Sequence, residues 1–239
     1  MRTEQVKSAF EDPSAYLKRR YRVRWRVDAV AAFLADRRFE SCADFGCGDG
    51  SLSVPFLGRI GHLTLVDTSQ AMLDAARKSV ASADLPRVEF FNGDADNVAL
   101  APGSLDLALC VGLLAHITSP EAILARLTTF LKPGGLLILE HTDAQHPAGW
   151  LLIQYSRLRS QVSPAHYPWN AVGATTLLST CEKLGLELQA EYRFGLPFRL
   201  DRIVADEPLY HLGKFIFGGA NHNTNGWLGC ERMYCMVKR

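Results

Sequence analysis

Three glycines at alternate positions, Gly46, Gly48 and Gly50, directly follow the short apolar run SCADF. An apolar run bounded by glycines is typical of a buried strand that ends in a tight turn. In an open parallel sheet, ligands bind outside the carboxyl ends of the strands, which is where this loop would lie. The glycines therefore have two explanations: the turn needs positive φ angles, or a ligand lies against the backbone.

Strand-like and helix-like segments alternate along most of the chain. We expect strands at residues 41–45, 63–67, 87–91, 105–111 and 136–141, and helices at 23–34, 69–81, 119–131 and 177–184. Near the carboxyl end, residues 186–194 and 232–238 alternate apolar and polar positions like exposed edge strands. This rhythm predicts the α/β class, with a doubly wound, mostly parallel sheet, helices on both faces and an antiparallel end.

Composition and charge limit the classes of function. The chain has 239 residues, 48% of them hydrophobic, so one globular domain over 1–239 can bury a sizeable core. Its formal net charge is +1, which gives no overall basic field for nucleic acid or anionic membrane, and any anionic partner must be met locally. No apolar signal core or run of about 18 apolar residues is present. We expect a cytoplasmic monomer or homodimer with no nucleic-acid or membrane partner.

The six cysteines, at positions 42, 47, 110, 181, 230 and 235, form no C-x-x-C pair. Several lie in apolar, strand-like runs, where cysteine behaves as a small hydrophobe. We therefore expect buried free thiols and no metal site.

Two segments, 143–170 and 195–228, are longer than ordinary connections and rich in aromatic, histidine and proline residues. We interpret them as insertions that form a substrate cap, with residues 1–40 as an N-terminal helical lid. The run KRRYRVRWR at 18–26 is either a solvated helix face or a lid that meets an anionic group.

The acid at Asp67 favours a ligand at the glycine loop. It lies 19 residues after Gly48, at the end of the next expected strand, where a carboxylate can accept both hydroxyls of a ribose. Dinucleotide folds use G-x-G-x-x-G, but here serine occupies the third glycine position whether the count starts at Gly46 or at Gly48. The pattern is instead D-x-G-x-G-x-G, in which Asp44 would repel a phosphate and suit a cationic amine. A cofactor with an ammonium group and a ribose, but no phosphate, fits best.

The sequence DFGCGDG followed by LVDTSQAMLDAAR resembles the first two motifs of the class I S-adenosylmethionine-dependent methyltransferase family. The resemblance continues through FFNGDADNVALAPGSLDLALCVGLLAHI and LKPGGLLILEH, and covers about residues 40–141 in family order. It implies S-adenosyl-L-methionine as cofactor, S-adenosyl-L-homocysteine as product, and a seven-stranded Rossmann-like sheet whose last strand is reversed.

The resemblance also implies a set of cofactor-binding residues. The loop would pass under the methionine part, an acid would meet its ammonium group, and later strand ends would hold the ribose and the adenine. The loop residues are Phe45, Gly46, Cys47 and Gly48, the acid at the ammonium group is Asp44, and Val111 lies on the methionine side. Asp67 would hold the ribose. Thr68 and Met72 would flank the adenine, with Asp94 and the Ala95 N–H at its edge. Two of them have plain alternatives, because Met72 could be a core residue and Asp94 a turn former.

The chemistry of methyl transfer depends mainly on alignment. Displacement at a sulfonium methyl needs donor and nucleophile in line and water excluded, while a general base is optional. Two histidines follow strand ends, His116 in LLAHI and His141 in LEHTD, and these are our candidates for catalytic proton transfer. Four others, in or beside the insertions, are weaker candidates: His146, His166, His211 and His222.

In that family, the N-terminal helices and the segments after the fifth and sixth strands commonly build the acceptor pocket. Here the two insertions carry many aromatic residues, namely Trp150, Tyr155, Tyr167, Trp169, Phe198, Tyr210, Phe215, Phe217 and Trp227. They suit an apolar or aromatic small molecule, although they could equally anchor the insertions to the core. The basic run at 18–26 could then meet the cofactor carboxylate or an anionic acceptor.

The sequence therefore predicts transfer of a methyl group to an oxygen, nitrogen or carbon nucleophile of a small molecule. A protein methyltransferase remains an alternative, as does a regulatory or scaffold homologue that binds the cofactor without turnover. Methylation of a nucleic-acid base is disfavoured because VGLLAHI stands where an N/D-P-P-Y/W motif would follow the fourth strand. The glycine spacing disfavours a dehydrogenase.

Overall fold

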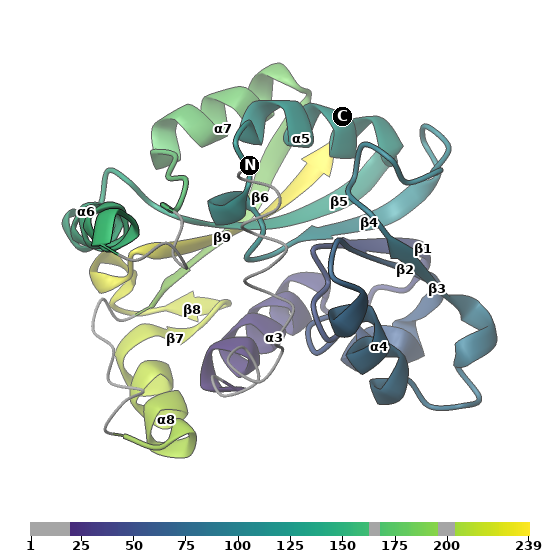
Figure 1. Cartoon of the computed structure of the whole chain (residues 1–239), viewed down its shortest axis with the longest axis horizontal. Coiled ribbons are helices and arrows are strands. Elements are labelled where there is room, and N and C mark those ends of the chain that lie inside the picture. Colours follow the sequence, from purple (N-terminus) through teal and green to yellow (C-terminus); the bar gives the residue numbers. More distant parts are fainter. Residues whose placement is uncertain (1–19, 163–167, 196–203) are drawn as a thin grey trace.

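The computed structural model describes residues 20–162, 168–195 and 204–239. Its centre is a seven-stranded sheet with the strand order β3-β2-β1-β4-β5-β9-β6 (Figure 1). These strands are β1 (Phe39–Phe45), β2 (Ile60–Asp67), β3 (Val88–Asn92), β4 (Leu105–Cys110), β5 (Leu131–Thr142), β6 (Leu186–Phe194) and β9 (Glu231–Lys238). Neighbours from β3 to β5 pair in parallel, and β9 is antiparallel to both β5 and β6. The predicted fold class and the reversed last strand are confirmed.

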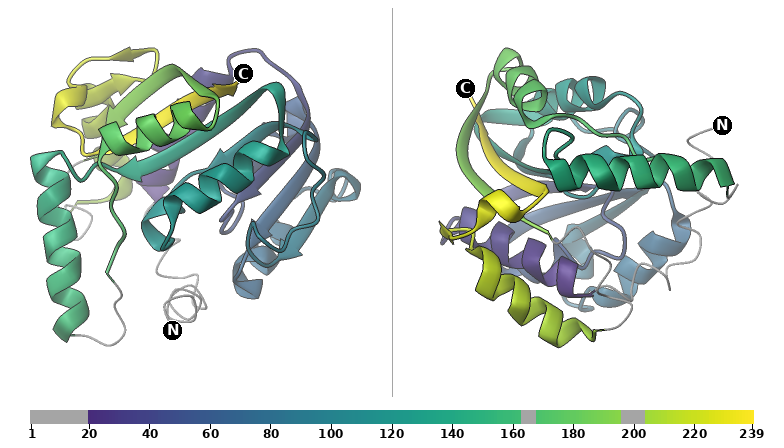
Figure 2. Two further views of the ribbon diagram at one scale, coloured as in Figure 1. Left: turned by 90° about the horizontal axis from the view of Figure 1, so that it is seen from above. Right: turned by 90° about the vertical axis from the view of Figure 1, so that its left-hand side faces the viewer.

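Helices cover both faces of this sheet (Figures 1 and 2). The described helices are α3 (Arg20–Leu34), α4 (Gln70–Ser79), α5 (Pro120–Phe130), α6 (Pro147–Val162), α7 (Ala174–Lys183) and α8 (Asp206–Phe217), and a short hairpin pairs β7 (Gly218–Gly219) with β8 (His222–Asn223). Side chains of α3, α4 and α8 share one hydrophobic core with the sheet, and those of α5 and α7 share the other. Successive strand residues alternate between the two cores, as the pleat requires.

The strand β9 differs from its predicted place. We expected 186–194 and 232–238 to be exposed edge strands, but β9 lies between β5 and β6. Its four middle residues, 233–236, are all buried, and of these two strands only β6 lies at an edge of the sheet. An uninterrupted apolar stretch such as MYCM is typical of a strand covered on both faces, and the polar residues at its two ends gave it the appearance of alternation.

Helix α3 is fixed against α8, far along the chain. The indole of Trp25 donates from Nε1 to the carbonyl of Tyr210 at 3.1 Å, and its ring meets that of Phe217 edge-on at 6.2 Å. At Gly213 an added Cβ would overlap the same indole, so the missing side chain allows the two helices to approach. Asp28 accepts from the hydroxyl of Tyr210 and pairs with a lysine of α8. Two segments outside the family-like region therefore form one unit.

All six cysteines are buried and free, as expected. Burial raises the pKa of each thiol, so these residues act as small hydrophobes and are poor nucleophiles. Within the described ranges, no helix has the length and apolar character needed to cross a bilayer. In the same ranges, no cluster of three or more histidine, cysteine or acidic side chains is arranged to hold a metal ion.

Candidate functional site

The glycine loop after β1 turns by means of positive φ angles. Gly46, Gly48 and Gly50 have φ of 73°, 55° and 73°, a region that side chains with a Cβ rarely adopt. The turn thus needs all three glycines. It also holds the loop against the end of β2, because the backbone N–H groups of Gly46 and Cys47 both donate to the carbonyl of Val66, at 2.8 and 3.1 Å.

Asp67, the last residue of β2, joins the loop to the start of α4. One carboxylate oxygen accepts from the Gly48 N–H at 2.9 Å and the other from the Ser69 N–H at 2.8 Å. Ser69 in turn caps α4, because its hydroxyl accepts from the N–H of Met72. Despite these donors, burial raises the pKa of Asp67. The Thr68 N–H is a third backbone donor, and a carboxylate has about four lone-pair sites, so Asp67 keeps capacity for a further donor such as a ribose hydroxyl.

Asp44 is a buried carboxylate beneath the same loop. It is 1% exposed, and its Oδ2 atom has no hydrogen-bond partner in the described part of the chain. Burial raises its pKa to about 7, and repulsion from Asp67 and Asp49 adds to the effect, whereas the Ser53 hydroxyl opposes it. A buried oxygen without a partner is costly unless a ligand supplies one. The geometry therefore favours a cationic donor at this point.

A small cavity of about 10 Å³ lies beside Asp44 and is closed by α3. Its walls are Val23, Arg26, Asp44, Gly46, Cys47, Leu52 and Val111. This is roughly the space of one water molecule. An amino-acid group is larger than this, so α3 or its side chains must shift to admit one.

Arg26 and Glu140 form a buried ion pair at the same end of the sheet. Nε of Arg26 donates to Oε1 of Glu140 at 2.9 Å, Nη2 lies 2.8 Å from Oε2 as an ion pair, and the Glu140 side chain is 1% exposed. Burial raises the pKa of Glu140, and the Coulombic attraction of Arg26 opposes that rise. Sequence analysis missed this pair. The only signals were a glutamate at the end of an otherwise apolar strand and an arginine in the basic run, 114 positions apart.

The comparisons with known proteins agree with this geometry. Residues 42–135 match the model of the methyltransferase domain family. This match falls within the stretch, about residues 40–141, that resembles the class I S-adenosylmethionine-dependent methyltransferases. A demethylmenaquinone methyltransferase of Listeria monocytogenes is 25% identical over 150 residues, which are 62% of this chain and 63% of that protein.

Solved structures share the whole fold of this chain at low identity. A methyltransferase of Thermotoga maritima aligns with a TM-score of 0.66 and 22% identity, covering 98% of this chain and 99% of the other. The magnesium protoporphyrin IX methyltransferase of Synechocystis, solved with S-adenosylhomocysteine, aligns with a TM-score of 0.66 and 16% identity over the full length of both. The curated relatives, by contrast, are matched over a third to less than two thirds of their own length.

Two of the predicted residues have the chemistry that the expected cofactor needs at its methionine and ribose ends. The unpartnered oxygen of Asp44 suits the ammonium group, and the Asp67 carboxylate suits the ribose hydroxyls. Val111 lines the small cavity with Asp44, Gly46 and Cys47, and its role on the methionine side remains a prediction. The side chain of Phe45 points to the other face, where it stacks on Phe130 at 6.0 Å, so only its backbone belongs to the loop.

The residues predicted around the adenine are less clearly arranged. Met72 is 1% exposed, which a core role would also explain, and Thr68 is half-buried. Asp94 is exposed, and its Oδ1 accepts from the N–H groups of Asp96 and Asn97, so it does form a turn. The buried Ala95 follows it. The adenine-binding roles of these residues remain predictions.

The two candidate catalytic histidines lie in different surroundings. His116 is half-buried at the end of a short helical turn after β4, and Asn170, beyond α6, donates to the neighbouring carbonyls of Ala115 and Ile117. His141 is 4% exposed, faces the α5 and α7 side of the sheet, and stacks on Tyr234.

Both ring nitrogens of His141 have partners, because Nδ1 donates to the carbonyl of Val172 and Nε2 accepts from the hydroxyl of Tyr234. Burial lowers the pKa of His141, so its ring is neutral. Asp44 and Glu140 lie on the opposite face of the sheet. This placement favours a packing role for His141. Of the weaker candidates, His166 lies outside the described residues, as do Tyr167 and Phe198.

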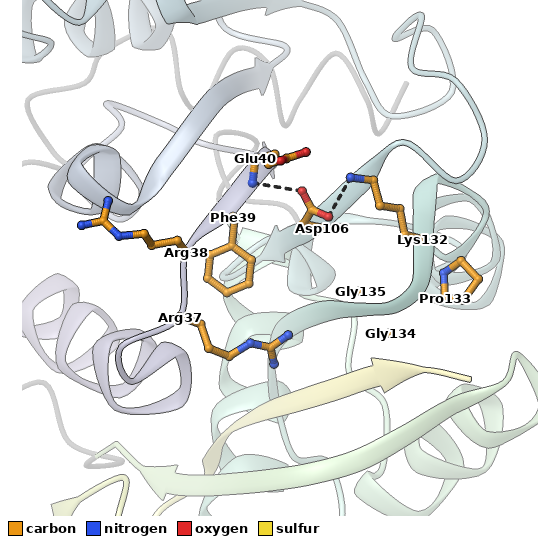
Figure 3. A pocket seen from close by; sticks show the side chains of 9 residues that line it. All are labelled: Arg37, Arg38, Phe39, Glu40, Asp106, Lys132, Pro133, Gly134 and Gly135. Atoms are coloured by element: carbon orange, nitrogen blue, oxygen red, sulfur yellow. Dashed lines mark hydrogen bonds and ion pairs between the residues drawn. The ribbon is translucent and has the colours of Figure 1, made fainter.

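A larger hollow of about 180 Å³ lies at the amino ends of the central strands, at the other end of the sheet from the glycine loop (Figure 3). It is formed where β1, β4 and β5 begin, and Asp106 joins these strands by pairing with Lys132 at 2.7 Å and accepting from the Glu40 N–H at 3.0 Å. None of the predicted site residues lines it. We interpret it as a structural feature of the strand starts.

Proposed function

We propose that this chain transfers a methyl group from S-adenosyl-L-methionine to an oxygen, nitrogen or carbon nucleophile of an apolar or aromatic small molecule. The observation that carries the proposal is the unpartnered buried carboxylate of Asp44, next to a glycine loop that Asp67 holds in place. When bound, the cofactor supplies an electrophilic methyl group on a sulfonium. The chain's own residues hold the cofactor, align its methyl group with the acceptor and exclude water.

Arg26 is our candidate for the carboxylate of the cofactor. Arg26 and Asp44 both line the small cavity, and Arg26 lies on α3, the helix that closes this cavity. From this position Arg26 could exchange its ion pair with Glu140 for one with the incoming carboxylate. Planar guanidinium groups suit bidentate binding of carboxylates. This supports the interpretation of the basic run as part of a lid.

His116 is the candidate for proton transfer where the acceptor needs it. It follows the carboxyl end of β4, and the segment after α6 contacts the same turn. The acceptor class is supported by the relatives named demethylmenaquinone methyltransferases. A half-buried histidine near neutral pH is a suitable general base.

The test is calorimetric titration with S-adenosylhomocysteine, with NADH as a control ligand. We expect micromolar binding by the wild type, none by Asp67→Ala, and unchanged binding by Asp74→Ala, an exposed acid of α4. Release of S-adenosylhomocysteine from S-adenosylmethionine is then measured with quinols, phenols and aromatic amines. Preference for NADH, or binding that Asp67→Ala retains, would overturn the cofactor site. Binding without release for any acceptor would favour the regulatory alternative.

A further inference from the structure

Helix α6 has an exposed apolar stripe on the face opposite its packed face. The residues buried against the body are Gly149, Ile153 and Ser156. Four apolar side chains at intervals of four, three and four residues are instead exposed, and we call them the α6 stripe: Leu151 (60%), Tyr155 (50%), Leu158 (63%) and Val162 (76%). At about 100° per residue, the two sets lie on opposite sides of the helix. The stripe therefore faces away from the side of α6 that is buried.

The position of α6 makes this stripe accessible. The helix begins five residues after the carboxyl end of β5, and it projects from the body beside the core helices (Figure 2). Further exposed residues continue the apolar surface at its amino end. Trp150 is 53% exposed, and a hydrogen bond from His146 to the carbonyl of Trp227 brings Trp227 (69%) to the same end. Soluble proteins rarely expose so many large apolar side chains together without a partner.

The charges of α6 indicate which partner. Its only charged residues are Arg157 and Arg159, with no acid anywhere in the helix. Neither arginine makes an ion pair with any residue that the structure describes. Leucine and tyrosine on one face, with Arg159 beside that face and Arg157 further round the helix, are typical of a helix that lies in a membrane interface.

A second copy of the chain is a poorer occupant. Two stripes meeting antiparallel would bring Arg159 of both copies to the rim near the middle of the contact, where like charges repel. An anionic lipid surface instead attracts both Arg157 and Arg159.

We propose that the α6 stripe docks this chain on an anionic lipid surface. Docking there presents the carboxyl edge of the sheet, where β5 ends and α6 begins, to molecules dissolved in the bilayer. The inference goes beyond the proposed activity and does not depend on it, because lipid binding needs neither cofactor nor turnover. It also revises the expectation of no membrane partner, which considered the net charge of +1 and not its local distribution.

The test is co-sedimentation of the full chain with phosphatidylglycerol-rich vesicles and with phosphatidylcholine vesicles. We expect the wild type to partition onto the anionic vesicles, and Leu151→Gln/Leu158→Gln to bind at least tenfold more weakly because two apolar contacts are lost. Arg157→Gln and Arg159→Gln should each weaken binding about fivefold. The control is Leu188→Gln, an exposed leucine of β6 outside the stripe, which should bind as the wild type does.

Several outcomes would overturn this proposal. One is absence of vesicle binding by the wild type, and another is equal binding by the double-leucine variant. A third is a dimer in light scattering that the double-leucine variant loses, which would identify a second copy as the occupant. Titration of every variant with S-adenosylhomocysteine shows whether the fold and the cofactor site are intact. Failure of lipid binding with normal titration thus refutes docking and leaves the proposed function untouched.

Discussion

At the residue scale, Asp44 links the site to pH. Its pKa of about 7 lies above the ordinary value of 3.8, so between these values the folded chain holds a proton that the unfolded chain has released. Stability contributed by this group therefore falls as pH rises through that window. A cofactor ammonium group needs the charged carboxylate, so binding must release the proton below pH 7.

We predict that the affinity for S-adenosylhomocysteine rises by up to about tenfold per pH unit towards pH 7 and then levels off. Titration calorimetry from pH 5.5 to 8.5, in buffers of different ionisation enthalpy, measures both the affinity and the released proton. Asp44→Asn should bind weakly and with little pH dependence. A flat profile for the wild type would show that Asp44 is already charged or that it does not meet the ligand.

The Arg26–Glu140 pair makes a second prediction about single residues. Arg26→Gln leaves Glu140 buried without its partner, which should destabilise the fold by about 3–5 kcal/mol in urea unfolding. Arg26→Met/Glu140→Met removes both charges and should recover most of that stability. If Arg26 also binds the cofactor carboxylate, the double variant should fold well and still bind S-adenosylhomocysteine at least tenfold more weakly. Equal stability of the single and double variants would contradict this account.

At the scale of elements, local pattern predicted most of the sheet. Each of the first five strands was placed from an apolar run next to a turn signal, and α4 from a serine cap and helical spacing. Pairing partners could not be predicted in the same way. The insertion of β9 between β5 and β6 depends on contacts about 95 residues from β5, and its ends resemble those of an edge strand.

Packing of α3 on α8 gives a prediction for Gly213. An alanine there would overlap the indole of Trp25, and such overpacking should cost about 1–3 kcal/mol. The matched control is Gly219→Ala, nearby in the chain, where an added Cβ meets nothing within 4 Å. Urea unfolding of both variants measures the difference. Equal stability of the two variants would mean that α3 and α8 move apart freely, and the lid would then be looser than the Trp25 contacts indicate.

At the scale of the whole molecule, the sequence was informative for the part of the candidate site whose residues are close together in the chain. The glycine loop, Asp44 and Asp67 lie within a short stretch, and β1 and β2 are neighbours, so spacing alone was informative. Arg26 reaches Glu140 only because α3 crosses the ends of strands far along the chain. His141 misled because strand parity decides which face a residue occupies, and the face that holds the cofactor is set by helices elsewhere in the sequence.

Because loop, strand ends and α3 all meet at the cofactor site, ligand binding should stabilise the chain as one unit. We predict a single cooperative unfolding transition by calorimetry, since both cores are built on one sheet and share its strands. S-adenosylhomocysteine at about 100 times its Kd should add about 2.7 kcal/mol, which for a chain of this size raises the Tm by roughly 5–10 °C. NADH should not move the Tm. Two transitions, of which only one responds to the ligand, would show that the segment after β5 forms a separate domain and that α3 does not close over the site.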